Sequence, residues 1–199
     1  MDLKNFDWSQ FTISFYYPVD VEKLYKLWAT SAGLESFFIE KAIFTNNKSA
    51  IRKRNELINA GDSYEWKWRH DFEVSGRVLE AKRNERLAFT FGSMHFSLDF
   101  KTTAEGSLIY LQQKNITEEN KVMGHLNCRS CWIFFLTNLK SILITGVDLR
   151  DKNPDIVSSM EVGFFPHQFL PPDITALDPE SNSINPALLK QSKQFGVNH

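Results

Sequence analysis

Two cysteines, Cys128 and Cys131, have the spacing in this sequence that most directly suggests chemistry. They are the chain's only cysteines and form a C-x-x-C pair. This spacing occurs in redox dithiols and as half of a zinc site. A redox dithiol needs an exposed thiolate of low pKa at a helix N-terminus, and zinc needs two further ligands. The element that carries the pair therefore decides between these chemistries and a structural role.

The pattern around the cysteines predicts one long helix, from about 120 to 145, with Gly146 as its C-cap. At 100° per residue, an apolar stripe falls within about 60° of Cys128. This stripe contains Cys131, Trp132, Phe135, Leu139, Ile142 and Leu143. Both thiols are thus expected inside the helix on its packing face. Because no second C-x-x-C and no H-x₃₋₅-H pair accompanies them, we interpret them as apolar packing residues and predict no metal, cofactor or catalytic residue.

The histidines provide one candidate ligand-contacting residue and no catalytic group. In the alternating stretch "SYEWKWRH", His70 shares a strand face with Trp66 and Trp68 and ends that strand, where it is placed to hydrogen-bond a ligand. A surface histidine at a strand end is the competing interpretation. His95 alternates out of phase with its apolar neighbours and is expected to face outward. No acid–base pair, Ser-His-Asp set or glycine-rich phosphate loop can be assembled, which argues against an enzyme without excluding one.

The elements that must position these residues are legible in the pattern. A strand ends at Pro18, two short helices follow, Asp20 caps the first, and a strand returns before a basic loop. An antiparallel meander then leads to the long helix. The predicted ranges are 11–18 (strand), 21–30 and 31–38 (helices), 39–45 (strand), 62–116 (meander) and 120–145 (helix). Because the long helix is the element able to cover the apolar face of the sheet, the fold class is α+β.

Composition narrows the functional classes. The 199 residues carry a net charge of −1, which does not favour a nucleic-acid partner. No secretory leader is visible at the N-terminus, and no apolar run reaches the ~20 residues that a membrane span requires. We therefore expect a cytoplasmic protein. The aromatic content is 14%, with 17 Phe and 5 Trp, enough to fill a core or to line a cavity.

Proline divides the chain into two parts. Pro18 is the only proline before residue 150, and six follow it. We expect residues 1–150 to form one domain and residues 151–199 to form an irregular tail. The tail contains Phe164, Phe165 and Phe169, too apolar a set for a free linker. Packing on its own domain and packing on a second subunit, as in a homodimer, both remain open.

Three stretches resemble a known family. "VDVEKLYKLWATSAGLESFF" is similar to a segment of two short helices, "SGRVLEAKRNERLAFTF" to a strand pair, and "GHLNCRSCWIFFLTNLKSILITGVDLR" to a closing helix. Together they resemble the START-like helix-grip superfamily (SRPBCC), within it proteins related to the C-terminal domain of the heat-shock-protein-90 ATPase activator. The resemblance covers roughly residues 10 to 150. The family's usual Trp in the second short helix is replaced here by Phe37 or Phe38.

The resemblance implies a curved antiparallel sheet wrapped around a long C-terminal helix, with an apolar cavity between them. Its members bind hydrophobic small molecules such as lipids, sterols or polyketides, regulate a chaperone, or act as cyclases, so all three functions remain open. We favour ligand binding. The residues expected to line the cavity are Trp66, Trp68, His70, Phe89, Phe91, Phe96, Cys128, Cys131, Trp132, Phe135 and Leu139. A filled core is the competing interpretation of the same residues.

Overall fold

The structure is a computed structural model that describes residues 6–68, 72–117, 121–151 and 153. It concerns the first of the two units into which the chain divides, Met1–Arg150. The expectations for the tail, with Phe164, Phe165 and Phe169, lie outside the described residues, as does His70.

Seven strands form one antiparallel sheet in the order β1-β7-β6-β5-β4-β3-β2. The strands are β1 (Phe11–Tyr17), β2 (Lys41–Thr45), β3 (Ser63–Lys67), β4 (Glu73–Lys82), β5 (Arg86–Phe91), β6 (Met94–Thr103) and β7 (Gly106–Lys114). Apart from β1, which closes against β7, each strand pairs with its neighbour in sequence. The alternation expected from sequence is present, since Tyr64 and Trp66 are buried whereas Glu65 between them is exposed.

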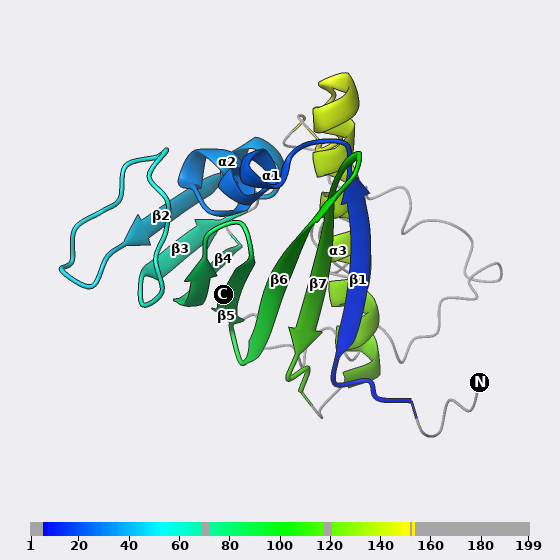
Figure 1. Ribbon diagram of the computed structural model, residues 1–199. Coiled ribbons are helices and arrows are strands. Elements are labelled where there is room, and N and C mark those ends of the chain that lie inside the picture. Colours follow the sequence, from blue (N-terminus) through cyan, green and yellow to red (C-terminus); the bar gives the residue numbers. More distant parts are fainter. Residues whose placement is uncertain (1–5, 69–71, 118–120, 152, 154–199) are drawn as a thin grey trace. The chain divides into compact units, whose positions relative to one another are not determined.

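The helices occupy one side of the sheet (Figure 1). They are α1 (Val21–Trp28), α2 (Ser31–Phe37) and the long α3 (Lys121–Thr145). Asp20 caps α1 by accepting from the Lys23 N–H, as the sequence predicts. Gly146, at φ 76°, ends α3 in the left-handed conformation. The fold class is therefore α+β, an antiparallel sheet with a long C-terminal helix and two short helices after the first strand.

The core lies between the sheet and the helices. Trp28, Phe37, Trp66, Phe89 and Leu139 are each at most 1% exposed. At roughly 1.5–3 kcal/mol for each large apolar side chain fully buried, such residues provide most of the favourable free energy of folding. Tyr17 anchors β1 to the helix, because its hydroxyl donates to the Leu136 carbonyl at 3.0 Å.

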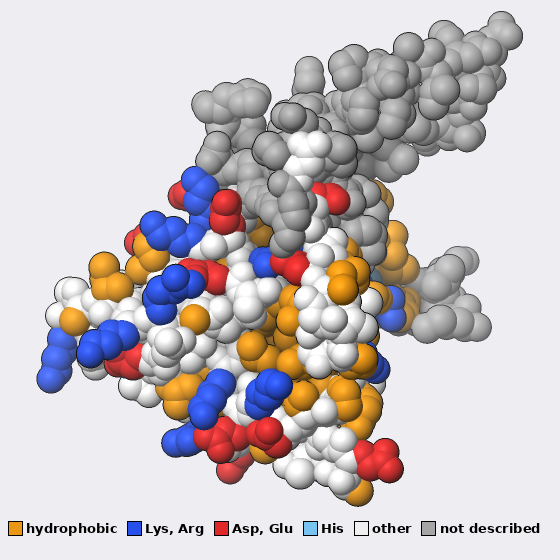
Figure 2. Space-filling view, turned by 90° about the horizontal axis from the view of Figure 1, so that it is seen from above, with side chains coloured by type: hydrophobic (Ala, Val, Ile, Leu, Met, Phe, Trp, Pro, Cys, Tyr) orange, Lys and Arg blue, Asp and Glu red, His pale blue; other side chains and the backbone are white. Residues whose placement is uncertain are grey.

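The outer surface carries charges of both signs. Lysine, arginine, aspartate and glutamate side chains lie interspersed over the face seen from above (Figure 2). Several form ion pairs, such as Lys26 with Glu22 and Arg86 with Asp99. In the part of the chain that the structure describes, no helix is both long and apolar enough to cross a membrane.

Candidate functional site

Phe38 is the centre of a cluster of aromatic rings between α2, α3 and the sheet. It is the C-cap residue of α2, which directs its ring inward. The ring stacks on Trp132 at 5.2 Å and meets Trp68 edge-on at 5.2 Å. The other rings around it belong to Trp28, Phe37, Trp66 and Phe135. We call the rings described in this and the next paragraph the ring cluster.

Seven of the predicted cavity residues belong to the ring cluster. Strand β3 supplies Trp66, and Trp68 follows it. Phe89 stacks on Phe96 at 4.9 Å, and Phe96 lies 4.8 Å from Trp132. Phe91 joins from the end of β5, and Phe135 from α3. The alternating strands and the helical stripe therefore bring these rings together in the interior.

The remaining predicted residues lie at the margin or elsewhere. Leu139 is buried in the same core, whereas Cys128 and Cys131 are only partly buried and pack against it. His95 is exposed, 3.4 Å from Asn115, which agrees with its outward phase. Both thiols are free. Among the described residues, no group of three or more His, Cys, Asp or Glu side chains is arranged to hold a metal ion.

Cys128 borders a buried amide. Gln113 on β7 is fully buried and accepts a hydrogen bond from the Trp132 indole N–H at 2.5 Å. Its amide N–H donates to the Met94 sulfur at 3.1 Å. Burial raises the pKa of the Cys128 thiol to about 11, and a hydrogen bond with Gln113 opposes part of that rise. The thiol is therefore protonated near neutral pH and is a poor nucleophile.

Tyr64 is a second titratable group beside the rings. It stacks on Trp66 at 4.1 Å, and its hydroxyl donates to the Thr90 carbonyl. Burial raises its pKa, so Tyr64 also stays neutral near pH 7. Both Tyr64 and Cys128 are thus available as hydrogen-bonding groups rather than as charged ones.

Two buried donors in the ring cluster lack an acceptor. The indole nitrogens of Trp28 and Trp66 have no hydrogen-bond partner among the described residues, although the two residues are 0% and 1% exposed. Both rings contact Phe38. A buried N–H without an acceptor lowers the stability of the folded state by about 1–3 kcal/mol. Its presence in a folded protein therefore needs an explanation, and a bound ligand is one.

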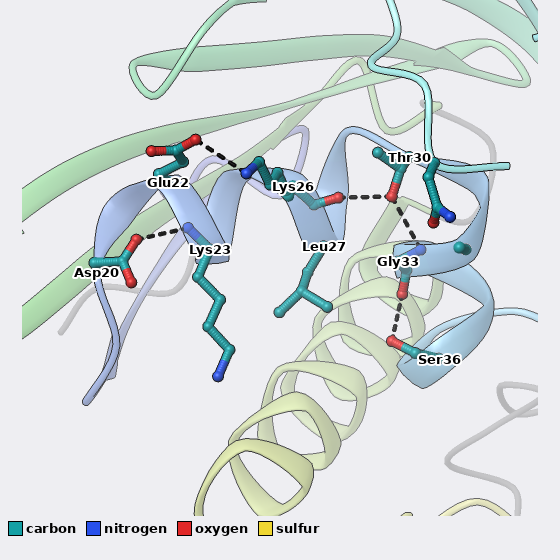
Figure 3. Close-up of a pocket in the computed structure, with 10 residues that line it drawn as sticks. Asp20, Glu22, Lys23, Lys26, Leu27, Thr30, Gly33 and Ser36 are labelled. Carbon is teal, nitrogen blue, oxygen red and sulfur yellow. Dashed lines mark hydrogen bonds and ion pairs between the residues drawn. The ribbon is translucent and has the colours of Figure 1, made fainter. Parts of the chain in front are cut away.

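A surface pocket of about 580 Å³ lies along α1 and α2 (Figure 3). It is lined by Asp20, Glu22, Lys23, Lys26, Leu27, Thr30, Ala32, Gly33, Ser36 and Asn55. Two of its polar side chains already make hydrogen bonds to the backbone of the two helices. Thr30 bridges the Lys26 carbonyl and the Gly33 N–H, and Ser36 donates to the Gly33 carbonyl. None of the predicted cavity residues borders this pocket.

Sequence reasoning missed three residues of the site: Trp28, Phe38 and Gln113. Trp28 lies on the buried face of α1, and Gln113 lies at a position of β7 where strand alternation places an inward side chain. A signal for Phe38 exists in the resemblance, because Phe37 or Phe38 stands where the resembling family usually has a Trp.

The sheet, the gripping helix and the aromatic interior define a START-like helix-grip protein. The chain belongs to the family described as Activator of Hsp90 ATPase homolog 1-like protein, whose sequence model matches residues 18–143. A comparison with curated proteins found no match.

Solved structures with the same fold are distant in sequence. A crystal structure of a Staphylococcus saprophyticus protein is 18% identical with a TM-score of 0.59, covering 71% of this chain and 96% of its own. The Aha1 dimer of Colwellia psychrerythraea, solved in solution, is 16% identical with a TM-score of 0.55, covering 69% and 97%. DynU16, described as a putative protein in the dynemicin biosynthetic locus, is 15% identical with a TM-score of 0.55, covering 70% and 49%. At these identities the comparisons show a shared fold.

Proposed function

We propose that this protein binds a small hydrophobic molecule that carries a hydrogen-bond acceptor, at the ring cluster between the sheet and α3. The observation that carries the proposal is the pair of buried indole N–H groups of Trp28 and Trp66, which lack acceptors among the described residues. A carbonyl or ether oxygen on an apolar ligand would accept from them, while the surrounding rings would bury its carbon skeleton. DynU16, from a biosynthetic locus, supports this ligand class by its fold.

Two probes of matched skeleton test the acceptor. Benzophenone carries a carbonyl between its two phenyl rings, and diphenylmethane carries a methylene group in that place. Calorimetric titration is expected to show tighter binding of benzophenone by roughly 5–150-fold, because one buried hydrogen bond is worth about 1–3 kcal/mol. Binding of neither probe, together with a native mass spectrum of the purified protein free of any retained molecule, would refute the proposal.

The Trp66→Phe variant tests whether the indole N–H of Trp66 donates to the benzophenone carbonyl. This substitution keeps an aromatic ring and removes the N–H, so benzophenone should weaken toward the affinity of diphenylmethane. The affinity of diphenylmethane itself should change little. Trp8→Phe is the matched control, because Trp8 packs against Phe6 and His125, away from the ring cluster. Equal losses for both probes would assign Trp66 a packing role only.

The family match supports a second candidate, regulation of a chaperone ATPase of the heat-shock-protein-90 type. The Colwellia structure, described as an Aha1 dimer, similarly supports a homodimer of this chain. Cosedimentation with such a chaperone and its ATP hydrolysis rate test the chaperone role. Absence of both binding and stimulation would remove it. Light scattering of the purified full chain tests the homodimer, and a monomer mass at high concentration would contradict it.

A further inference from the structure

The ring cluster is packed ring against ring, so a ligand can enter only if an aromatic side chain moves. Phe38 contacts aromatic rings from α1, α3 and the sheet, and it sits at the end of a helix rather than within the sheet. Its backbone is held locally by the Phe38 N–H and the Ile39 N–H, which both donate to the Leu34 carbonyl. What fixes this end of α2 therefore decides whether Phe38 can leave.

Arg150 holds the C-terminal end of α2 from a distant part of the chain. Its guanidinium donates to the carbonyls of Glu35 and Ser36, at 3.1 and 3.0 Å, and to that of Ile39, at 3.0 Å. The last carbonyls of a helix lack partners within the helix and carry partial negative charge, so a cation is favoured there. One side chain thereby satisfies three backbone acceptors on both sides of Phe38.

Two further residues position Arg150. Asp148 accepts from the Arg150 Nε at 3.0 Å and from Nη2 at 2.8 Å. Asn138, fully buried on α3, donates to the Phe37 carbonyl at 2.8 Å and to Asp148 at 3.1 Å. Its amide oxygen accepts from the Leu149 N–H at 2.7 Å. We call Asn138, Asp148 and Arg150 the Arg150 network.

The two ends of α2 are held by different kinds of contact. At the N-terminal end, Thr30 caps the helix and Gly33 approaches the backbone of Leu27 so closely that an added Cβ would lie 2.4 Å from the Leu27 oxygen. That packing is tight and brings backbone against backbone. At the C-terminal end, the side chains of Arg150 and Asp148 remain 14% and 20% exposed, so water can compete for their hydrogen bonds. The C-terminal end is therefore the end that can open.

We propose that the Arg150 network is a latch that keeps the end of α2 closed over the ring cluster, and that its release lets Phe38 swing out and admits the ligand. Arg150 acts here as a positioning residue. The entry of a ligand rests on the proposed ligand-binding function. The closure of α2 does not, and it can be measured without any ligand.

Hydrogen exchange of the ligand-free full chain tests the closure. Arg150→Gln removes the charge and the forked donor, and Asp148→Asn weakens the same contacts more mildly. We expect exchange in residues 34–40 to accelerate by about tenfold or more in Arg150→Gln, and less in Asp148→Asn, while the β6–β7 hairpin stays protected. Arg83→Gln is the matched control, because Arg83 pairs with Glu22 on the surface of α1. Acceleration spread evenly over the fold, or none in 34–40, would overturn the latch.

Stopped-flow binding of Nile red, an apolar fluorescent probe with a carbonyl, tests admission. Release of the latch should raise both the association and the dissociation rate constants, by several-fold each. If wild-type protein binds Nile red and Arg150→Gln changes neither rate, the latch is refuted while ligand binding stands. If exchange opens locally but no variant binds Nile red or benzophenone, ligand binding and admission both fail, and only the opening of α2 remains. Where Arg150→Gln does not fold, Asp148→Asn decides the same comparisons.

Discussion

At the scale of single residues, burial keeps the titratable groups beside the rings, the Cys128 thiol and the Tyr64 hydroxyl, neutral near pH 7. Cys128 shows this most clearly, because burial holds the pKa of its thiol at about 11. The folded-state pKa is raised above the unfolded value of roughly 8.5, so this group's contribution to stability is complete below that value. That contribution is lost as the pH rises from about 8.5 toward 11, because over this range the thiol ionises in the unfolded chain and stays protonated in the folded protein.

We therefore predict slow alkylation of Cys128 by iodoacetamide at pH 7–9 in the folded protein. In a Cys131→Ala background, where Cys128 is the only thiol, the rate should climb with pH through about 11, whereas the urea-unfolded chain should titrate near 8.5. Rates followed by intact mass give both profiles. A folded profile that rises near 8.5 would show an exposed thiol and would contradict the assigned burial.

Asn138 is the fully buried member of the Arg150 network. Replacement by alanine leaves the Phe37 carbonyl and the Leu149 N–H without partners in a buried site. We predict a loss of about 2–4 kcal/mol in the free energy of unfolding, measured by urea titration. Thr137→Ala is the control, because Thr137 is exposed next to it on α3 and should change stability by less than about 0.5 kcal/mol. Similar losses in both variants would contradict the role of Asn138.

At the scale of elements, periodicity predicted the strands, the two short helices and the long helix, together with their inward faces. Tyr64, Trp66 and Phe96 could be placed because each period fixes which side chains share a face. Asn138 and Arg150 could not, because their partners are backbone carbonyls more than a hundred residues away. The periodic spacing of apolar residues carries no information about such long-range hydrogen bonds. The sequence also offered no way to tell that Phe38, rather than open space, occupies the centre of the rings.

Glycine positions give a test of how closely the elements pack. In Gly33→Ala the new methyl would meet the Leu27 backbone, which cannot move aside without separating α1 from α2. We predict a loss of about 1–3 kcal/mol or more. Gly124→Ala on α3 meets only the Ile116 methyl group at 3.1 Å, and replacing a helical glycine by alanine gains about 0.8–1 kcal/mol of helix propensity. Its stability should be unchanged or higher, so the two alanines are expected to differ in sign or in size. Equal effects would contradict the close approach of α1 and α2.

At the scale of the whole molecule, the sequence suggests a boundary near residue 150, and the Arg150 network shows why its position matters. Leu149 and Arg150 follow the helix and resemble the start of a linker, yet their hydrogen bonds reach α2 and α3. A chain ending just after this segment keeps every contact that the structure describes for the sheet and helices. A chain ending just before it loses the network while keeping the same sheet and the whole of α3.

Two truncations separate these cases. We predict that a chain of residues 1–153 unfolds in urea in one cooperative transition, with stability close to that of the full chain. A chain of residues 1–147 lacks Asp148 and Arg150, so it should lose about 2–4 kcal/mol and show faster hydrogen exchange in residues 34–40. Circular dichroism during the titration measures the first effect and exchange mass spectrometry the second. If 1–153 is itself much less stable than the full chain, residues beyond 153 contribute to the fold. If 1–147 matches 1–153, the Arg150 network does not hold α2.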